Sequence, residues 1–212
     1  MAAHRPSRAK NGARGGQKVV LNAGSGSAAS GGLPPYFESW RELRVDLNPS
    51  SNPDIVASIV DLREIPDGSV DAVWSSHCVE HLLPHEVPLA LAEFRRVLSR
   101  NGFTIIIVPD LQAIAEWIAE DRLHEIVYES PSGPVTAHDM LWGYGPALER
   151  GDLTMAHRCG FTPTLLVRRL QVARFPHILL RRRSTWELAA LMLRSARGGP
   201  QETMRLMTEI GL

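Results

Sequence analysis

Hydrophobic positions along the chain follow two spacings, which predict strands that alternate with helices. Short apolar runs rich in Val, Ile and Leu predict strands at 18–23, 43–47, 54–59, 70–76, 103–109, 177–183 and 186–193. Apolar spacings of three and four residues, or capping residues, predict helices at 87–98, 111–120 and 163–173. Strands alternating with helices form a mostly parallel sheet with helices on both faces, so we expect a doubly wound α/β fold.

Breaks in these patterns divide the chain into segments. Residues 1–17 are rich in Arg, Gly, Ala and Ser without periodicity, so we expect a disordered basic tail. A single domain is expected over 18–194, with an insert of loops and short helices at 121–160 and a C-terminal tail with one short helix at 195–212. Gly31-Gly32 and Pro34-Pro35 restrict the helix after the first strand to about one turn near 36–40.

Composition changes this picture little. The 212 residues are 44% hydrophobic and 22% charged, and their formal net charge is zero, which gives no overall electrostatic reason to bind nucleic acid. No apolar run reaches membrane-spanning length and no signal peptide is visible. Two cysteines make no disulfide framework, so we expect a cytoplasmic protein; its oligomeric state is open.

Candidate chemistry gathers where the predicted strands end. Gly24, Asp46, Asp61, His77 and Asp110 all lie at or just after a strand, and open parallel sheets bind ligands at this edge. The first strand stops at Gly24-Ser-Gly26, where glycine permits a tight turn and close approach of backbone to a ligand. A Gly-Ser loop without a ligand is the alternative.

Two carboxylates suit a nucleoside. Asp46 comes 22 residues after Gly24 and could accept both ribose hydroxyls, whereas Asp61 could contact an adenine amino group. Either residue could instead cap the turn that follows it. With the glycine loop, the two acids would form an adenosine site that needs no phosphate.

These residues resemble a known family. Val-Val-Leu-Asn-Ala-Gly-Ser-Gly, Val-Asp-Leu-Asn-Pro and Asp-Leu-Arg-Glu-Ile-Pro-Asp-Gly-Ser-Val-Asp-Ala-Val-Trp-Ser-Ser-His-Cys-Val-Glu-His-Leu closely resemble class I S-adenosylmethionine-dependent methyltransferases, as does Phe-Arg-Arg-Val-Leu-Ser-Arg-Asn-Gly. The later Asp-Met-Leu-Trp-Gly and His-Arg-Cys-Gly-Phe-Thr resemble a subgroup with an abbreviated first helix. The resemblance covers about 18–193 and implies a seven-stranded Rossmann-like sheet with an antiparallel last strand.

The resemblance also implies the cofactor, S-adenosylmethionine, and the residues that would hold it. The glycine loop would face the methionine moiety, Asp46 the ribose, and Asp61 with Leu62 the adenine. The full expected set is Asn22, Ala23, Gly24, Ser25, Gly26, Asp46, Leu47, Asp61, Leu62, Ser76 and His77. Asn22 stands where the family usually has an acid, and Asn101-Gly102 replaces the commoner Gly-Gly.

The implied reaction is in-line displacement at a sulfonium methyl group, for which the protein mainly supplies alignment. A hydroxyl acceptor would also need a base, and His157, His138 and His77 are the candidates. The structural alternative is a buried histidine for His157 and a helix cap or surface residue for His138. Asp110, Tyr144 and Arg158 are the expected acceptor-side residues. We therefore expect a methyltransferase acting on an O or N atom of a small-molecule or saccharide-type acceptor.

Other interpretations remain open at this point. A nicotinamide-dependent oxidoreductase would fit Gly24-Ser-Gly-Ser-Ala-Ala29, although no helix can follow directly to hold a pyrophosphate. A cofactor-binding protein without catalysis is also possible. His77, His81 and His85 have helical spacing for a metal, but Pro84 breaks such a helix, so no metal site is expected. The arginines at 181–183 could contact RNA, although a solvated strand edge is commoner.

Overall fold

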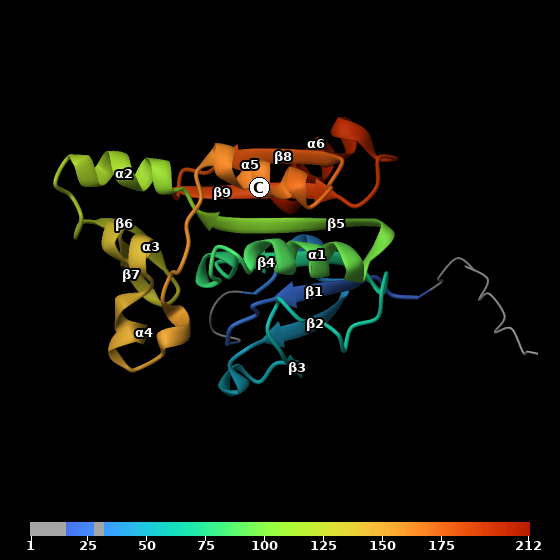
Figure 1. Ribbon diagram of the computed structural model, residues 1–212, viewed down its shortest axis with the longest axis horizontal. Helices are drawn as coiled ribbons and strands as arrows, with labels where there is room; N and C mark the ends of the chain where they lie inside the picture. Colours follow the sequence, from blue (N-terminus) through green and yellow to red (C-terminus); the bar gives the residue numbers. More distant parts are fainter. Residues whose placement is uncertain (1–15, 28–31) are drawn as a thin grey trace, which may run out of the picture.

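A computed structural model describes residues 16–27 and 32–212. It contains a seven-stranded sheet in the order β3-β2-β1-β4-β5-β9-β8, shown in Figure 1. The first five strands of this order are parallel, and β9 runs antiparallel to both of its neighbours. The expected doubly wound sheet with an antiparallel last strand is therefore confirmed. The strands are β1 (Val19–Ala23), β2 (Arg41–Asp46), β3 (Ile55–Val56), β4 (Val70–Ser76), β5 (Leu98–Pro109), β8 (His177–Arg182) and β9 (Glu187–Leu193).

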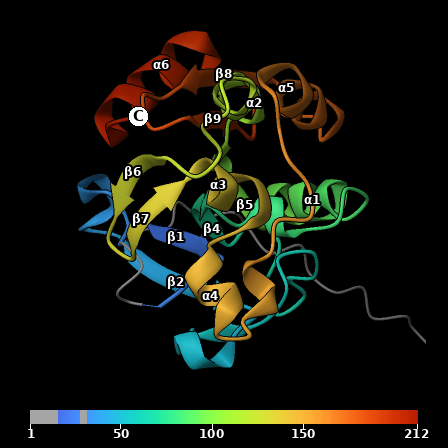
Figure 2. The ribbon, with the colours of Figure 1, turned by 90° about the vertical axis from the view of Figure 1, so that its left-hand side faces the viewer.

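Alternate side chains of the central strands enter two separate cores. Leu21 and Ile106 point to one face, where they pack with α1 (Val87–Val97) and α5 (Pro163–Val172). Val20 and Ile105 point to the other face, towards η1 (Pro35–Phe37) and α6 (Gly199–Ile210). Figure 2 shows α6 on one side of the sheet and α1 with α5 on the other. Burial on both faces explains why β5 reads as a continuous apolar run.

The helices begin where the capping residues predict. Asp110 accepts hydrogen bonds from the backbone N–H groups of Gln112 and Ala113 at the start of α2 (Leu111–Ala119). Thr162 accepts from Leu165 N at the start of α5, where Pro163 occupies the first turn. Both caps satisfy N–H groups that have no partner inside the helix.

Residues 121–160 lie across the carboxyl ends of the parallel strands (Figures 1 and 2). They contain the expected short helices α3 (Ala137–Trp142) and α4 (Gly145–Glu149), and the one-turn η4 (Leu153–Met155). They also contain a hairpin of β6 (Ile126–Ser130) and β7 (Gly133–Thr136), which the sequence analysis did not predict. Its signal was the turn segment Pro131-Ser-Gly133 between two β-branched stretches.

Both ends of the chain were predicted to be tails. The 195–212 segment, expected to be a tail with a short helix, forms the 12-residue α6, which buries Leu206, Met207 and Ile210 against the sheet. Apolar side chains on one helical face give it a place in the core. Of the expected disordered tail at 1–17, residues 1–15 lie outside the described residues.

The arginines at 181–183 are engaged within the chain. Arg182 Nε donates to Asp110, Arg183 pairs with Glu187, and Arg181 donates to the carbonyl oxygen of Leu212. These contacts hold all three guanidinium groups at and just after the edge strand β8.

Candidate functional site

A cavity of about 550 Å³ opens at the carboxyl ends of β1, β2 and β4 and is walled on its far side by the 121–160 insert. Its lining from the sheet side includes Asn22, Gly24, Ser25, Gly26, Asp46, Leu47, Ser76 and His77, and from the insert side Tyr128, Met140, Tyr144, His157 and Arg158. A second cavity, about 630 Å³, lies at the opposite edge of the sheet beside Lys18 and Gly102. The first cavity holds the expected chemistry.

The glycine loop is pressed against the exit of β4. Gly24 has φ +77°, and a Cβ built there would lie 2.3 Å from Cys78 Sγ. The N–H groups of Gly24 and Ser25 both donate to the carbonyl oxygen of Val45, at 2.9 and 3.1 Å, which ties the loop to β2. Only glycine combines this positive φ with so close an approach.

Asp46 lies beside this loop at the end of β2. Its Oδ2 accepts from Gly26 N at 2.7 Å and its Oδ1 accepts from Asn48 N at 2.8 Å. The carboxylate is therefore held at the cavity rim by backbone donors, next to Leu47, which is 59% exposed. This is the geometry expected for a carboxylate that accepts hydroxyl donors from a ligand.

The other residues expected at the glycine loop differ in their access to the cavity. Asn22 lines the cavity, but its Nδ2 donates to Glu42 Oε1 at 2.7 Å. Ala23 is fully buried and does not line the cavity. The Ser25 hydroxyl is buried and has no hydrogen-bond partner among the described residues, which leaves it available to a ligand.

Asp61 and Leu62, the expected adenine contacts, do not line this cavity. Asp61 lies outside the cavity lining, and its exposed carboxylate pairs with Arg63, which lowers the pKa of Asp61. Leu62 is buried in the core, where its N–H donates to Glu93 at 2.8 Å. Because β3 ends at Val56, the chain turns earlier than predicted, and Ala57, Ser58 and Ile59 form the cavity wall there.

His77 follows β4 with φ +48° and lines the cavity. Its Nε2 lies 2.7 Å from Glu187 Oε1 and its Nδ1 lies 3.4 Å from Glu80 Oε1. Burial opposes the charged ring, but the hydrogen bond to Glu187 and the negative charges of Glu187 and Glu80 outweigh it and raise the pKa of His77 to about 10. His77 is therefore a cation at neutral pH, placed between two acids.

The insert supplies polar groups that sequence reasoning missed as well as some that it named. Burial, with the nearby charges of Glu187 and Glu80, raises the pKa of Tyr128 to about 12. Tyr144 lines the cavity and its hydroxyl donates to the carbonyl oxygen of Ser132. The Tyr128 phenol stays neutral at physiological pH and can donate a hydrogen bond to a ligand.

Three of the expected catalytic or acceptor residues differ in whether they line the cavity. His157 lines the cavity, and burial lowers its pKa. His138 does not line it, because its ring stacks on His124 and packs beside Trp142. Asp110 is 1% exposed and is not part of the cavity lining; it caps α2 and pairs with Arg182. Neither His138 nor Asp110 therefore lines this cavity.

The comparisons with known proteins agree with this geometry. A family model described as "Methyltransferase domain" matches residues 34–106, which run from η1 into β5. No curated protein sequence matches the chain. No helix in the described parts of the chain is long and apolar enough to cross a membrane.

Several solved structures share the fold at low sequence identity. A protein of Pyrococcus horikoshii is 14% identical with a TM-score of 0.56, over 85% of this chain and 83% of that one. A SAM-dependent methyltransferase of Archaeoglobus fulgidus is 15% identical with a TM-score of 0.52, over 84% and 86%. A structure titled as SAM-dependent methyltransferases from Methanosarcina mazei is 15% identical with a TM-score of 0.52, over 84% and 91%. These structures show that the chain has the fold of S-adenosylmethionine-dependent methyltransferases, and residues 34–106 match the methyltransferase-domain model.

Proposed function

We propose that this chain transfers the methyl group of S-adenosylmethionine to an O or N atom of a small-molecule or saccharide-type acceptor. The observation that carries the proposal is the single cavity of about 550 Å³ that joins the glycine loop and Asp46 to the polar wall of the insert. A cavity of this size suits small ligands. It gives the cofactor and the acceptor adjacent walls, which methyl transfer requires.

The sheet side of the cavity is proposed to hold the cofactor. The backbone of Gly24–Gly26 would face the methionine moiety, Asp46 would accept the ribose hydroxyls, and Ser76 with His77 would lie beside the cofactor. For the adenine we propose Ala57–Ile59 in place of Asp61 and Leu62, because these residues form the wall beyond β3. Charge-assisted hydrogen bonds to Asp46 would contribute about 1.5–3 kcal/mol each.

The insert side is proposed to hold the acceptor. Polar residues of the insert that line the cavity include Tyr128, Tyr144, His157 and Arg158. The sulfonium methyl group is already reactive, so the chain chiefly aligns the acceptor atom with it, an effect worth about 7–11 kcal/mol in favourable cases. A polar wall favours acceptors with hydroxyl or amino groups over purely apolar ones.

Calorimetric titration tests the cofactor half of the proposal. S-adenosylhomocysteine should bind with one site per chain, whereas NAD⁺ should not bind under the same conditions. Binding of NAD⁺ alone would favour the oxidoreductase alternative and overturn the proposal.

Formation of S-adenosylhomocysteine from S-adenosylmethionine tests the catalytic half. A panel of monosaccharides, phenols, hydroxy acids and amines should contain acceptors that raise this formation above the acceptor-free rate. Binding of the cofactor with no turnover on any member, or on extracted metabolites, would favour a binding protein.

A further inference from the structure

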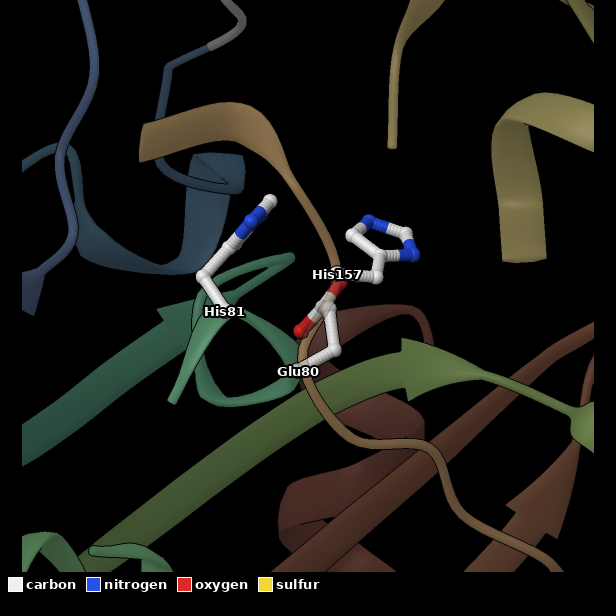
Figure 3. A group of neighbouring side chains, drawn as sticks. All are labelled: Glu80, His81 and His157. Carbon is white, nitrogen blue, oxygen red and sulfur yellow. The ribbon is translucent and has the colours of Figure 1, made fainter. Parts of the chain in front are cut away.

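Three side chains that can bind a metal converge at the insert side of the cavity. Glu80 and His81 belong to η3 (Val79–His81), which follows β4, and His157 precedes α5. One donor atom from each lies within 4.8 Å of the others. Figure 3 shows the three side chains gathered at one place from two segments that are far apart in the sequence.

The tautomers of both histidines are determined by their backbone contacts. His81 Nδ1 lies 3.1 Å from the carbonyl oxygen of Ala156, and His157 Nδ1 lies 3.0 Å from that of Met140. A carbonyl oxygen only accepts, so each Nδ1 carries the proton and each Nε2 carries a lone pair. Neither Nε2 forms a hydrogen bond within residues 16–27 and 32–212. An imidazole oriented through one N–H to a backbone carbonyl is the usual arrangement of a metal-binding histidine.

Glu80 is the second independent observation. Its side chain is 1% exposed, and neither carboxylate oxygen has a hydrogen-bond partner among the described residues. His77 Nδ1, 3.4 Å from Oε1, provides one opposite charge. His77 compensates this buried carboxylate from one side, but its oxygens keep acceptor capacity that a further cation could use. That cation would lie between Glu80 and the two Nε2 atoms.

Backbone hydrogen bonds hold the two segments together. The N–H groups of Arg158 and Cys159 both donate to the carbonyl oxygen of Glu80, at 2.8 and 3.1 Å. His157 N donates to the carbonyl oxygen of Trp142 at 3.1 Å. The three side chains are thus positioned by main-chain contacts that do not depend on a bound ion.

We propose that Glu80, His81 and His157 bind one divalent transition-metal cation of the Zn²⁺ type, through a carboxylate oxygen and two Nε2 atoms. Two histidines and one carboxylate are a known ligand set for catalytic zinc and leave an open coordination position. Ligands at about 2.0–2.2 Å from one ion lie at most about 4.4 Å apart, a separation similar to the 4.8 Å within which these donor atoms lie. This site replaces the expectation of no metal, which concerned His77, His81 and His85 on a single helix.

The site also suggests a role that rests on the proposed function. Because His81 and His157 line the cavity, a cation there could receive a hydroxyl of the acceptor and lower the pKa of that hydroxyl. The proton leaves to solvent, the oxygen forms a bond to the methyl carbon, and the carbon–sulfur bond breaks with its electron pair going to sulfur. His157 would then be a ligand and not the general base. Acceptors with two neighbouring oxygens, such as diols or hydroxy acids, would be favoured.

Calorimetry of the chelator-treated full chain with Zn²⁺ tests the site directly, and Co²⁺ absorption reports the coordination. Wild type should bind one Zn²⁺, whereas Glu80→Gln and His157→Asn, each lacking one of three ligands, should lose about 100-fold or more in affinity. His85→Ala is the matched control, because His85 is exposed and outside the cluster, and it should bind as wild type does. Circular dichroism and S-adenosylhomocysteine affinity verify that each variant folds.

The outcomes separate the two proposals. Absence of Zn²⁺ binding by wild type, or equal binding by all four proteins, overturns the metal site. Cofactor binding without metal binding leaves the proposed function intact, whereas loss of S-adenosylhomocysteine binding in the metal-free wild type counts against the proposed function. If turnover of diols and hydroxy acids is unchanged by chelation while Zn²⁺ binds, the acceptor role is wrong.

Discussion

The glycine loop can be tested by adding a single methyl group. In Gly24→Ala the new Cβ would lie 2.3 Å from Cys78 Sγ and 2.6 Å from Cys78 Cβ, well inside van der Waals contact. The backbone at this residue is also in the left-handed region, with φ +77°. The substitution therefore combines backbone strain with steric overlap at the point where the cofactor is proposed to bind.

The magnitude follows from these two costs. Alanine in the left-handed region costs about 1–2 kcal/mol, and forcing extra volume into a packed site costs about 1–3 kcal/mol. Gly24→Ala should therefore lower the free energy of unfolding by about 2–5 kcal/mol, a large part of the 5–15 kcal/mol typical of a domain. Movement of the loop should also weaken S-adenosylhomocysteine binding.

Urea denaturation of a matched set measures each cost. Gly151 has φ +88° with no atom within 4 Å of an added Cβ, so Gly151→Ala should lose only the backbone cost, about 1–2 kcal/mol. Cys78→Gly removes both clashing atoms, and a double-mutant cycle with Gly24→Ala should give a coupling of about 1–3 kcal/mol. Equal losses for Gly24→Ala and Gly151→Ala, with no coupling to Cys78, would refute this account of the loop.

Three further predictions concern the carboxylates. Asp46→Ala should weaken S-adenosylhomocysteine binding at least about 10-fold in calorimetry, whereas the exposed Asp61→Ala should leave it unchanged; the reverse ranking would restore the original adenine assignment. Asp110→Ala should lower the free energy of unfolding by about 0.5–2 kcal/mol through loss of the α2 cap, with cofactor affinity unchanged; a weaker affinity would return Asp110 to the site. Burial alone would raise the pKa of Asp139, but hydrogen bonds from Thr136 and from Gly145 N outweigh it and lower this pKa. The carboxyl group has a pKa of about 4 in the unfolded chain and a lower pKa in the folded chain. Its ionised form therefore stabilises the fold above about pH 4, and this stabilisation is lost as the pH falls through the lower pKa. Wild type should therefore lose more stability than Asp139→Asn between pH 6 and pH 3 in urea titrations, and parallel losses would contradict this role.

Local sequence patterns determined most of the fold. The Val70–Ser76 strand, the helix that begins at Val87 and the capped helix that begins at Pro163 all lie where apolar spacing and capping residues predict them. These signals depend on neighbours a few residues apart, so they can be read without knowing the rest of the chain. The hairpin at 126–136 was not predicted because its two strands are short and the composition around its turn is irregular.

Which residues line the cavity depends instead on segments that are far apart in the sequence. Asp46 and Asp61 lie at or just after the end of a predicted strand, yet only Asp46 lines the cavity, because β3 ends after two residues and the chain turns before Asp61. Asp110 was correctly predicted as a cap, but it does not line the cavity, and its carboxylate pairs with Arg182, 72 residues away. A pattern of strand ends indicates an edge of the sheet, not which side chains face a ligand.

The sequence by itself determined most of the strands and helices along the chain, the glycine turn and the edge of the sheet at which the cavity opens. Only the tertiary structure decided that Glu80 and His81 meet His157, which lies 76 residues beyond His81, and that Ala57–Ile59 form a wall of the cavity. The physical reason is that backbone conformation is set largely by local sterics and hydrogen bonding, whereas the contents of a pocket depend on distant segments that pack together.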